Sequence, residues 1–283
     1  MEFRTVVDIR PSVFRIDPFA RMLFVGSCFA DSMGRRFKEE CFRVEANPYG
    51  VMYNPASILH TVERTAFVPD VAVFTLGTNH VYILKESGEI VDNCRKRPQH
   101  LFEEKELGVD ECAGFLSAAI DLLRQRNPEV RIILTVSPIR YAKYGFHGSQ
   151  LSKATLLLAT ESVQRKYAGK HDTEGCVSYF PAYEIVNDEL RDYRFYCADM
   201  LHPTEQAVEY IWQRFSETHF SEKAIGFMKE WKPIKTALRH RPFHPESETY
   251  RQFMEDTTRK IKELSGRYPD FRCPDMEVPE KPD

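Results

Sequence analysis

Apolar residues gather in four short runs between residues 21 and 180. The runs are Met22 to Val25, Asp70 to Leu76, Val130 to Val136 and Cys176 to Phe180. Nearly continuous apolar runs of this length are typical of parallel strands that are covered on both faces of a sheet. We therefore expect these segments to form a buried parallel sheet.

Segments with the apolar spacing of a helix alternate with the four runs. Apolar side chains recur every three to four residues over Asp31 to Glu40, Ala56 to Phe67, Asp110 to Asn127 and Ser152 to Lys166. Asp110 is expected to cap the third of these helices, and Asn127 with Pro128 to end it. Alternating strands and helices predict an α/β fold with helices on both faces of the sheet. Val81 to Leu84 and Ile90 to Val91 flank a polar turn and predict a hairpin.

The last part of the chain is helical. A helix is expected to begin at Pro203, and its buried face to consist of Ala207, Val208, Ile211, Trp212 and Phe215. A charged helix is expected from Ser221, and a second amphipathic helix from about Glu246 to Leu264. The tail from Pro269 to Asp283 is rich in proline and acidic residues, a composition typical of disorder. We expect a sheet domain over residues 1–220 and a C-terminal helical extension over residues 221–283.

The composition supports a large core and excludes several classes of protein. Hydrophobic residues make up 42% of the 283 residues, which suits one large domain with an appendage. The formal net charge of -3 comes with no basic stripe, so nucleic acid is not an expected partner. No run approaches the roughly 20 apolar residues of a membrane span, and the charged N-terminus is unlike a signal peptide. We expect no membrane partner.

Cysteine and histidine usage indicates a reducing compartment and no metal site. The seven cysteines are widely spaced without a Cys-x-x-Cys pair, which argues against a disulfide framework or a zinc ribbon. Among the nine histidines, His240 and His244 have metal-ligand spacing but lie in a segment broken by proline. We expect a cytoplasmic protein that uses no metal or cofactor.

Ser27 stands where the first strand ends and the first helix begins. Gly26 permits a sharp turn there, and the unpaired N–H groups of a helix start favour an alkoxide or oxyanion. Serine at such a position also caps helices, and capping is the simpler interpretation of Ser27 taken alone. Two further groups of polar residues instead favour the interpretation of Ser27 as a nucleophile.

Both of these groups contain residues suited to acyl transfer. Gly77 and Asn79 directly follow the second strand, and sites in open α/β sheets collect at the carboxyl ends of strands. Asp199 lies three residues before His202, so its carboxylate can bind Nδ1 of the ring and leave Nε2 as a base. A capping aspartate beside an unrelated histidine is the alternative. Together with Ser27, these residues supply a nucleophile, a base, an acid that orients the base, and an oxyanion donor.

The order Ser, Asp, His, with Asp three residues before His, resembles the SGNH (GDSL-type) serine hydrolases. More closely, Gly26-Ser27-Cys28-Phe29-Ala30 spells the motif that names the GSCFA family, a branch of that group. The similarity continues through Asn47 to Pro55, Thr75 to Leu84, Thr135 to Arg140, Ser152-Lys153 and Asp192 to Pro203. The resemblance implies a three-layer α/β/α fold and hydrolysis of an ester.

The resemblance also implies roles for individual residues. By position, Ser27 is the nucleophile, His202 the base and Asp199 the acid that orients the base. The oxyanion hole of the wider group uses the nucleophile's own N–H, a glycine N–H and an asparagine amide, which match Ser27, Gly50 and Asn79. Gly50 lies in a loop dense in Asn, Pro and Gly, whose restricted backbone suits the presentation of one N–H group.

Three positions depart from the pattern of the group. The acidic residue that usually precedes the nucleophile is missing before Ser27, His80 follows Asn79 where Asp is frequent, and Tyr141 stands where a histidine is common. No departure removes a triad member. His80, Arg140 and Tyr141 are candidate substrate contacts, and the departures at His80 and Tyr141 could alter what the pocket accepts. An ordinary surface charge is the simpler interpretation of Arg140.

A small-molecule or carbohydrate ester is the expected substrate. The same triad would serve an O-acyltransferase if water were excluded from the site. A non-catalytic binding module on the same fold would instead leave Ser27 unreactive. A cysteine hydrolase using Cys28 is disfavoured, because the family motif places the nucleophile at Ser27. The C-terminal helices offer a surface for oligomerisation or for packing on the sheet domain.

Overall fold

The computed structural model describes residues 4–94, 96–169 and 175–273 and contains a five-stranded parallel sheet at its centre. The strand order is β2-β1-β3-β7-β8. The strands are β1 (Arg21–Gly26), β2 (Arg43–Ala46), β3 (Val71–Leu76), β7 (Arg131–Val136) and β8 (Val177–Tyr179). Every residue of the central strand β3 is buried, which explains why its sequence is an unbroken apolar run.

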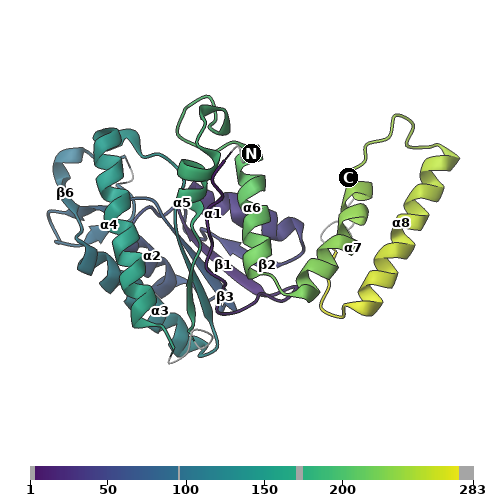
Figure 1. The fold of residues 1–283 in the computed structure, drawn as a ribbon, viewed down its shortest axis with the longest axis horizontal. Coiled ribbons are helices and arrows are strands. Elements are labelled where there is room, and N and C mark those ends of the chain that lie inside the picture. Colours follow the sequence, from purple (N-terminus) through teal and green to yellow (C-terminus); the bar gives the residue numbers. More distant parts are fainter. Residues whose placement is uncertain (1–3, 95, 170–174, 274–283) are drawn as a thin grey trace.

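Helices cover both faces of the sheet and complete a three-layer α/β/α fold, as expected (Figure 1). One face packs against α2 (Pro55–Arg64), α3 (Val109–Arg126) and α4 (Gly145–Lys166), and the other against α1 (Cys28–Glu39), α5 (Ala182–Glu184) and α6 (Glu205–His219). Phe37 of α1 packs edge-on against Trp212 of α6, with ring centroids 5.0 Å apart. Buried apolar side chains thus fill the space between the sheet and the helices on both of its faces.

The strand register brings the ends of β1, β3 and β7 together. Gly26 pairs with Thr75, and Thr75 in turn pairs with Thr135. Because the strands are parallel, the residues that follow them lie side by side at one edge of the sheet. Ser27 and Ser137 are two of these residues.

A small antiparallel sheet, in the order β5-β4-β6, lies beside this edge. It consists of β4 (His80–Leu84), β5 (Ile90–Val91) and β6 (Phe102–Glu106), and η1 (Gln99–Leu101) precedes β6. The predicted hairpin of β4 and β5 is confirmed. The sequence did not indicate β6, because four of its five residues are exposed and charged.

Two helix starts differ from the prediction. The N-cap of α3 is Gly108, whose N–H donates to Glu111 Oε2 at 2.9 Å, so Asp110 lies in the first turn and is not the cap. The helix α6 begins at Glu205 instead of Pro203, and Thr204 is its N-cap, because the Thr204 hydroxyl accepts the N–H of Ala207. The predicted buried face of α6 is confirmed at all five positions.

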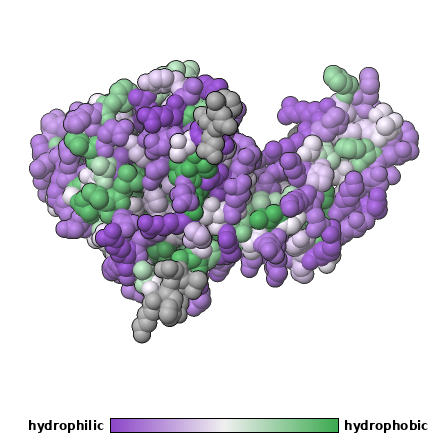
Figure 2. All heavy atoms as spheres, viewed as in Figure 1, coloured by the Kyte–Doolittle hydropathy of each residue, from purple (hydrophilic) through white to green (hydrophobic). Residues whose placement is uncertain are grey.

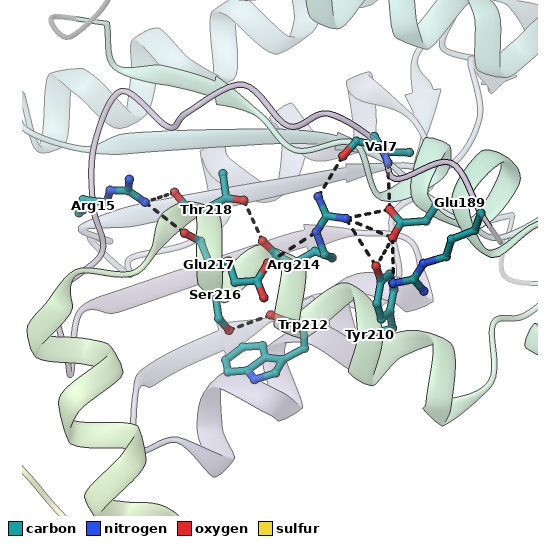
Figure 3. A network of polar contacts seen from close by, with 10 residues as sticks. Val7, Arg15, Glu189, Tyr210, Trp212, Arg214, Ser216, Glu217 and Thr218 are labelled. Atoms are coloured by element: carbon teal, nitrogen blue, oxygen red, sulfur yellow. Dashed lines mark hydrogen bonds and ion pairs between the residues drawn. The ribbon is translucent and has the colours of Figure 1, made fainter. Parts of the chain in front are cut away.

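Irregular helical segments connect β7 to α4 and β8 to α6. They are η2 (Ala142–Tyr144), η3 (Ile185–Leu190) and η4 (Tyr193–Phe195). The carboxylate of Glu189 in η3 is fully buried and pairs with Arg214 of α6 at 2.9 Å. It also accepts the N–H of Val7 at 3.1 Å and the hydroxyl of Tyr210 (Figure 3). This network fixes the N-terminal segment against α6.

The C-terminal part is a helical hairpin that extends away from the sheet domain (Figure 1). It consists of α7 (Glu222–Leu238) and α8 (Glu248–Arg267), which contain the two helices expected after Ser221. The buried Trp231 donates its indole N–H to the carbonyl of Glu39 at 2.8 Å, at the end of α1. Lys235 pairs with Glu40 nearby. The division at residue 220 stays a prediction, and residues 274–283 of the expected acidic tail lie outside the described residues.

The surface in the view of Figure 2 is mostly hydrophilic, with apolar residues in small separate areas over the main domain and the hairpin. Within residues 4–94, 96–169 and 175–273, no helix has both the length and the apolar character needed to cross a membrane.

Candidate active site

The turn that carries Ser27 depends on Gly26. Gly26 has a φ of +147°, and a Cβ at this position would lie 2.1 Å from the carbonyl oxygen of Thr75. No other residue fits so close to β3. Ser27 follows as the N-cap of α1, and its hydroxyl accepts the N–H of Phe29 at 3.3 Å. The capping interpretation is therefore observed, and it leaves the hydroxyl hydrogen available for another partner.

That hydrogen is donated to a second serine. Ser27 Oγ donates to Ser137 Oγ at 2.8 Å and lies 3.3 Å from Thr75 Oγ1. Ser27 is only 1% exposed. The candidate nucleophile is thus held by hydroxyl groups from the ends of β3 and β7.

Asp199 and His202 form the expected pair on the loop between η4 and α6. Asp199 Oδ2 lies 2.6 Å from Nδ1 of His202, so Nδ1 carries the hydrogen and Nε2 is the basic nitrogen. Asp199 Oδ1 accepts the backbone N–H groups of His202 at 3.0 Å and Leu201 at 2.8 Å. These backbone bonds, followed by the imidazole bond, lower the pKa of Asp199 to about 2. The carboxylate is therefore ionised at neutral pH.

Arg140 attaches the loop of Asp199 and His202, which we call the histidine loop, to the edge of the sheet where Ser27 lies. Its backbone N–H donates to the carbonyl of Leu201 at 3.0 Å, and its Nη1 donates to the carbonyl of Met200 at 3.0 Å. Because Arg140 follows β7, it brings the histidine loop to the strand end where Ser137 binds Ser27.

Arg140 holds the loop of His202 at the edge of the sheet where Ser27 lies. In the described part of the chain no hydrogen bond joins the serine and the histidine, since Ser27 Oγ is bonded to Ser137 and the imidazole to Asp199. The His202 side chain is 43% exposed, whereas Ser27 is buried. Direct proton transfer between the two therefore needs a local rearrangement.

The three expected oxyanion donors have acceptors within the protein. The N–H of Ser27 donates to the carbonyl of Thr75 at 3.0 Å, and the N–H of Gly50 to the carbonyl of Asn47 at 2.8 Å. Asn79 is buried, and its Nδ2 donates to the carbonyl of Leu107 at 2.8 Å. The Nδ2 nitrogen carries two hydrogens, and the bond to Leu107 uses one of them. The role of all three donors stays a prediction.

Two of the three expected substrate residues pack within an aromatic cluster. The buried ring of His80 stacks on Tyr144 with centroids 3.6 Å apart, and burial lowers the pKa of His80. Tyr141 lies 5.7 Å from Tyr144 and 5.9 Å from Tyr53, by ring centroids. We call Tyr53, Tyr141 and Tyr144 the tyrosine wall. His80 packs against this wall at Tyr144.

Arg140, the third expected substrate residue, stacks on the exposed ring of Phe146 and the half-buried ring of Tyr196. Its guanidinium carbon lies 3.9 Å from the ring centre of Phe146 and 5.5 Å from that of Tyr196. Its contacts thus join the loop after β7 to the segment that precedes the histidine loop.

Lys153 is a buried lysine to which the sequence assigned no role. Its Nζ donates to the carbonyls of Gly77 at 2.9 Å and Ser137 at 2.8 Å, at the ends of β3 and β7. Burial lowers the pKa of Lys153 to about 7. The signal in the sequence was one lysine on the otherwise small or apolar buried face of α4.

The described residues hold no cluster of three His, Cys, Asp or Glu side chains with the arrangement of a metal site.

Fold and site together define a three-layer α/β/α protein with a serine and an Asp–His pair at the carboxyl edge of its parallel sheet. The model described as the GSCFA family matches residues 21–68 and 64–215. A second model, described as GSCFA domain protein, C-terminal domain, matches residues 231–276. The chain belongs to the GSCFA family.

Solved structures with similar folds include a protein from Lactobacillus plantarum, with 14% identity and a TM-score of 0.47 over 73% of this chain and 100% of that one. An acetyl-xylooligosaccharide esterase from Geobacillus Stearmophilus has 14% identity and a TM-score of 0.45, over 74% and 98% of the two chains. A carbohydrate esterase family 3 protein from Talaromyces cellulolyticus has 13% identity and a TM-score of 0.43, over 75% and 99%. Comparison with curated protein sequences finds no match.

Proposed function

We propose that this GSCFA protein is a serine esterase of the SGNH type, with Ser27 as nucleophile, His202 as base and Asp199 as the acid that orients the ring. The observation that carries the proposal is the 2.6 Å contact between Asp199 Oδ2 and His202 Nδ1. It fixes the tautomer in which Nε2 accepts a proton, as a general base requires. The histidine loop is attached through Arg140 to the strand end that also holds Ser27.

The proposed reaction begins when the Ser27 hydroxyl leaves Ser137 and turns toward His202. Oγ of Ser27 then attacks the ester carbonyl, and Nε2 of His202 takes the hydroxyl proton. His202 returns this proton to the leaving alcohol as the ester bond breaks. Water, activated by the same nitrogen, releases the acid from Ser27.

In this proposal, Asn79 stabilises the oxyanion with the hydrogen of Nδ2 that does not bind Leu107. The N–H groups of Ser27 and Gly50 join it after exchanging their bonds to the carbonyls of Thr75 and Asn47. The turn at Gly50 is exposed, and among the described residues no atom beyond its chain neighbours lies within 4 Å of the place that a Cβ would take. Exchange there disturbs little of the core.

We propose a small O-acylated molecule, such as a carbohydrate acetate, as the substrate. The tyrosine wall, and the rings of Phe146 and Tyr196 beside Arg140, present flat faces near the strand ends. Aromatic faces bind the apolar side of a sugar ring well. The Arg140 guanidinium adds donors for hydroxyl or carboxylate groups of such a ring.

A second candidate function is acyl transfer to an alcohol. Ser27 is 1% exposed, and a nucleophile shielded from water favours an acceptor other than water. The third candidate, a non-catalytic binding module, has support in the lack of a hydrogen bond between Ser27 and His202 within the described residues.

Hydrolysis of p-nitrophenyl acetate by purified protein separates these functions. Ser27→Ala and His202→Ala should each lower the rate by at least about 10³-fold, as loss of a triad member does. Ser32→Ala is a matched control, because Ser32 lies in the helix that follows Ser27 and its hydroxyl donates to the carbonyl of Cys28 in the preceding turn. Free acetate as product supports the esterase, and an acetylated acceptor alcohol supports the transferase. Equal rates for the parent and Ser27→Ala would support the binding module.

A further inference from the structure

Lys153 lies inside the protein, and within the described part of the chain it has no carboxylate partner. The residue is 2% exposed, and burial alone accounts for the lowered pKa of its amine. A buried amine is destabilising unless its hydrogens are bonded. Lys153 uses them on two carbonyls, those of Gly77 and Ser137. A neutral amine has two hydrogens, one for each of these carbonyls.

Ser152 binds the same region beside Lys153. Its hydroxyl accepts the backbone N–H of Asn79 at 3.0 Å and lies 3.1 Å from Thr78 Oγ1. Ser152 and Lys153, which we call the α4 clamp, therefore hold the segment after β3 at three successive residues. Lys153 in addition reaches across to the segment after β7.

Both clamped segments lead to residues of the candidate active site. The segment after β3 carries Asn79, two residues beyond Gly77. The segment after β7 carries Ser137, which binds Ser27, and Arg140, which holds the loop of His202. A shift of either segment would thus change the distances among the nucleophile, the base and the amide donor.

We propose that Lys153 is a positioning residue, which sets the placement of Asn79 and the His202 loop relative to Ser27 by tying Gly77 to Ser137. The proposal rests on the proposed function of Ser27 and His202. Lys153 touches no substrate and takes no part in proton transfer. Its effect on catalysis arises because displacements of about 1 Å at a reacting group lower rates by up to about 10²-fold.

Asn127→Ala provides a matched control for Lys153→Met. Asn127 Nδ2 donates to the carbonyl of Pro69 at 2.8 Å and so ties the segments that enter β3 and β7. Each variant removes one tie between the same two strands, but only Lys153 is at the carboxyl ends. Lys153→Met should lower kcat for p-nitrophenyl acetate by about 10- to 100-fold with little change in KM. Asn127→Ala should keep kcat within about twofold of the parent.

Two more variants test the mechanism of positioning. Lys153→Gln supplies a neutral amide with two hydrogens and should recover part of the kcat lost in Lys153→Met. Ser152→Ala, which removes only the bond to Asn79 and the contact with Thr78, keeps the test available if Lys153→Met does not fold, and it should also lower kcat at unchanged KM. If Lys153→Met folds, a parental kcat in that variant overturns the proposal. If it does not fold, a parental kcat in Ser152→Ala overturns it. An equal loss of kcat in Asn127→Ala also overturns it.

Ser27→Ala in the same assay distinguishes this failure from failure of the proposed function. Full activity in Ser27→Ala would overturn the esterase and the clamp together. Loss of activity in Ser27→Ala with a parental kcat in Lys153→Met would overturn the role of Lys153 alone.

Discussion

The hydroxyl of Ser27 donates a hydrogen bond to the hydroxyl of Ser137 across 2.8 Å, although 110 positions separate the two in the chain. The contact exists because β1 and β7 both flank β3, so their ends are close. In the proposed reaction, this bond competes with the one that Ser27 must form to His202.

Ser137→Ala should accelerate the reaction of Ser27. Removing the competing acceptor favours the bond to His202 by the net strength of one hydrogen bond, roughly 1 kcal/mol or about fivefold in rate. The measurement is the second-order rate constant for labelling by a fluorophosphonate. A tenfold decrease would instead place Ser137 in the path of the proton.

Asn79→Ala should lower turnover of an acetyl ester by roughly 10²–10³-fold, the usual effect of losing one oxyanion donor. Its Leu107 bond gives Asn79 a structural role too, so the melting temperature is measured alongside. Asn127→Ala is a matched control, because its side-chain amide also donates to a backbone carbonyl, that of Pro69, but at the opposite end of the strands. Parental turnover in folded Asn79→Ala would remove Asn79 from the oxyanion hole.

The stability contribution of Lys153 should depend on pH. Burial lowers the pKa of the folded amine to about 7, whereas an unfolded lysine titrates near 10.4. Between these values the unfolded chain binds more protons, so the contribution of Lys153 to stability rises with pH and is lost toward pH 7. The free energy of unfolding of the parent, relative to Lys153→Met, should rise by about 1.4 kcal/mol per pH unit over this window.

Urea denaturation at two pH values near 7.5 and 9 measures this slope. Asn127→Ala has no titrating group at the substituted position, and its difference from the parent should stay constant. A constant difference for Lys153→Met as well would show that the amine keeps its ordinary pKa.

Trp231→Ala should destabilise the protein without changing its reactivity. The indole is buried against Phe227 and Phe271 and binds the Glu39 carbonyl, so truncation should lower the free energy of unfolding by about 3–5 kcal/mol. Trp231→Phe, which mainly loses the hydrogen bond, should lower it by about 1 kcal/mol. Ser27 labelling in the folded fraction should match the parent, and a loss there would connect the hairpin to the active site.

The sequence predicted those parts of the fold that depend on burial on both faces. β1, β3, β7 and β8 appear as apolar runs because helices cover them on two sides. β2 escaped prediction because none of its residues is fully buried at the edge of the sheet. β6 escaped because a solvated strand of charged residues has no apolar alternation.

For the site, local geometry was predictable and long-range pairing was not. The contact of Asp199 with His202 follows from a spacing of three residues within one turn. The pairing of Ser27 with Ser137, and of Lys153 with two carbonyls, depends on strand order, which a single sequence does not specify. His80 is a candidate substrate contact because it departs from the pattern of the group, and this role stays a prediction. That its ring is buried and stacks on Tyr144 could not be predicted, because Tyr144 is distant in the sequence.

The central claim is that Ser27 reacts with the help of His202 and Asp199, and fluorophosphonate labelling followed by mass spectrometry tests it most directly. We expect an adduct on Ser27 in the parent, none in Ser27→Ala, and labelling slower by roughly 10²–10⁴-fold in His202→Ala and Asp199→Asn. The pKa of about 2 keeps Asp199 charged throughout the neutral range in which labelling is measured. Absence of an adduct on parental Ser27, or an equal labelling rate in His202→Ala, would contradict the account.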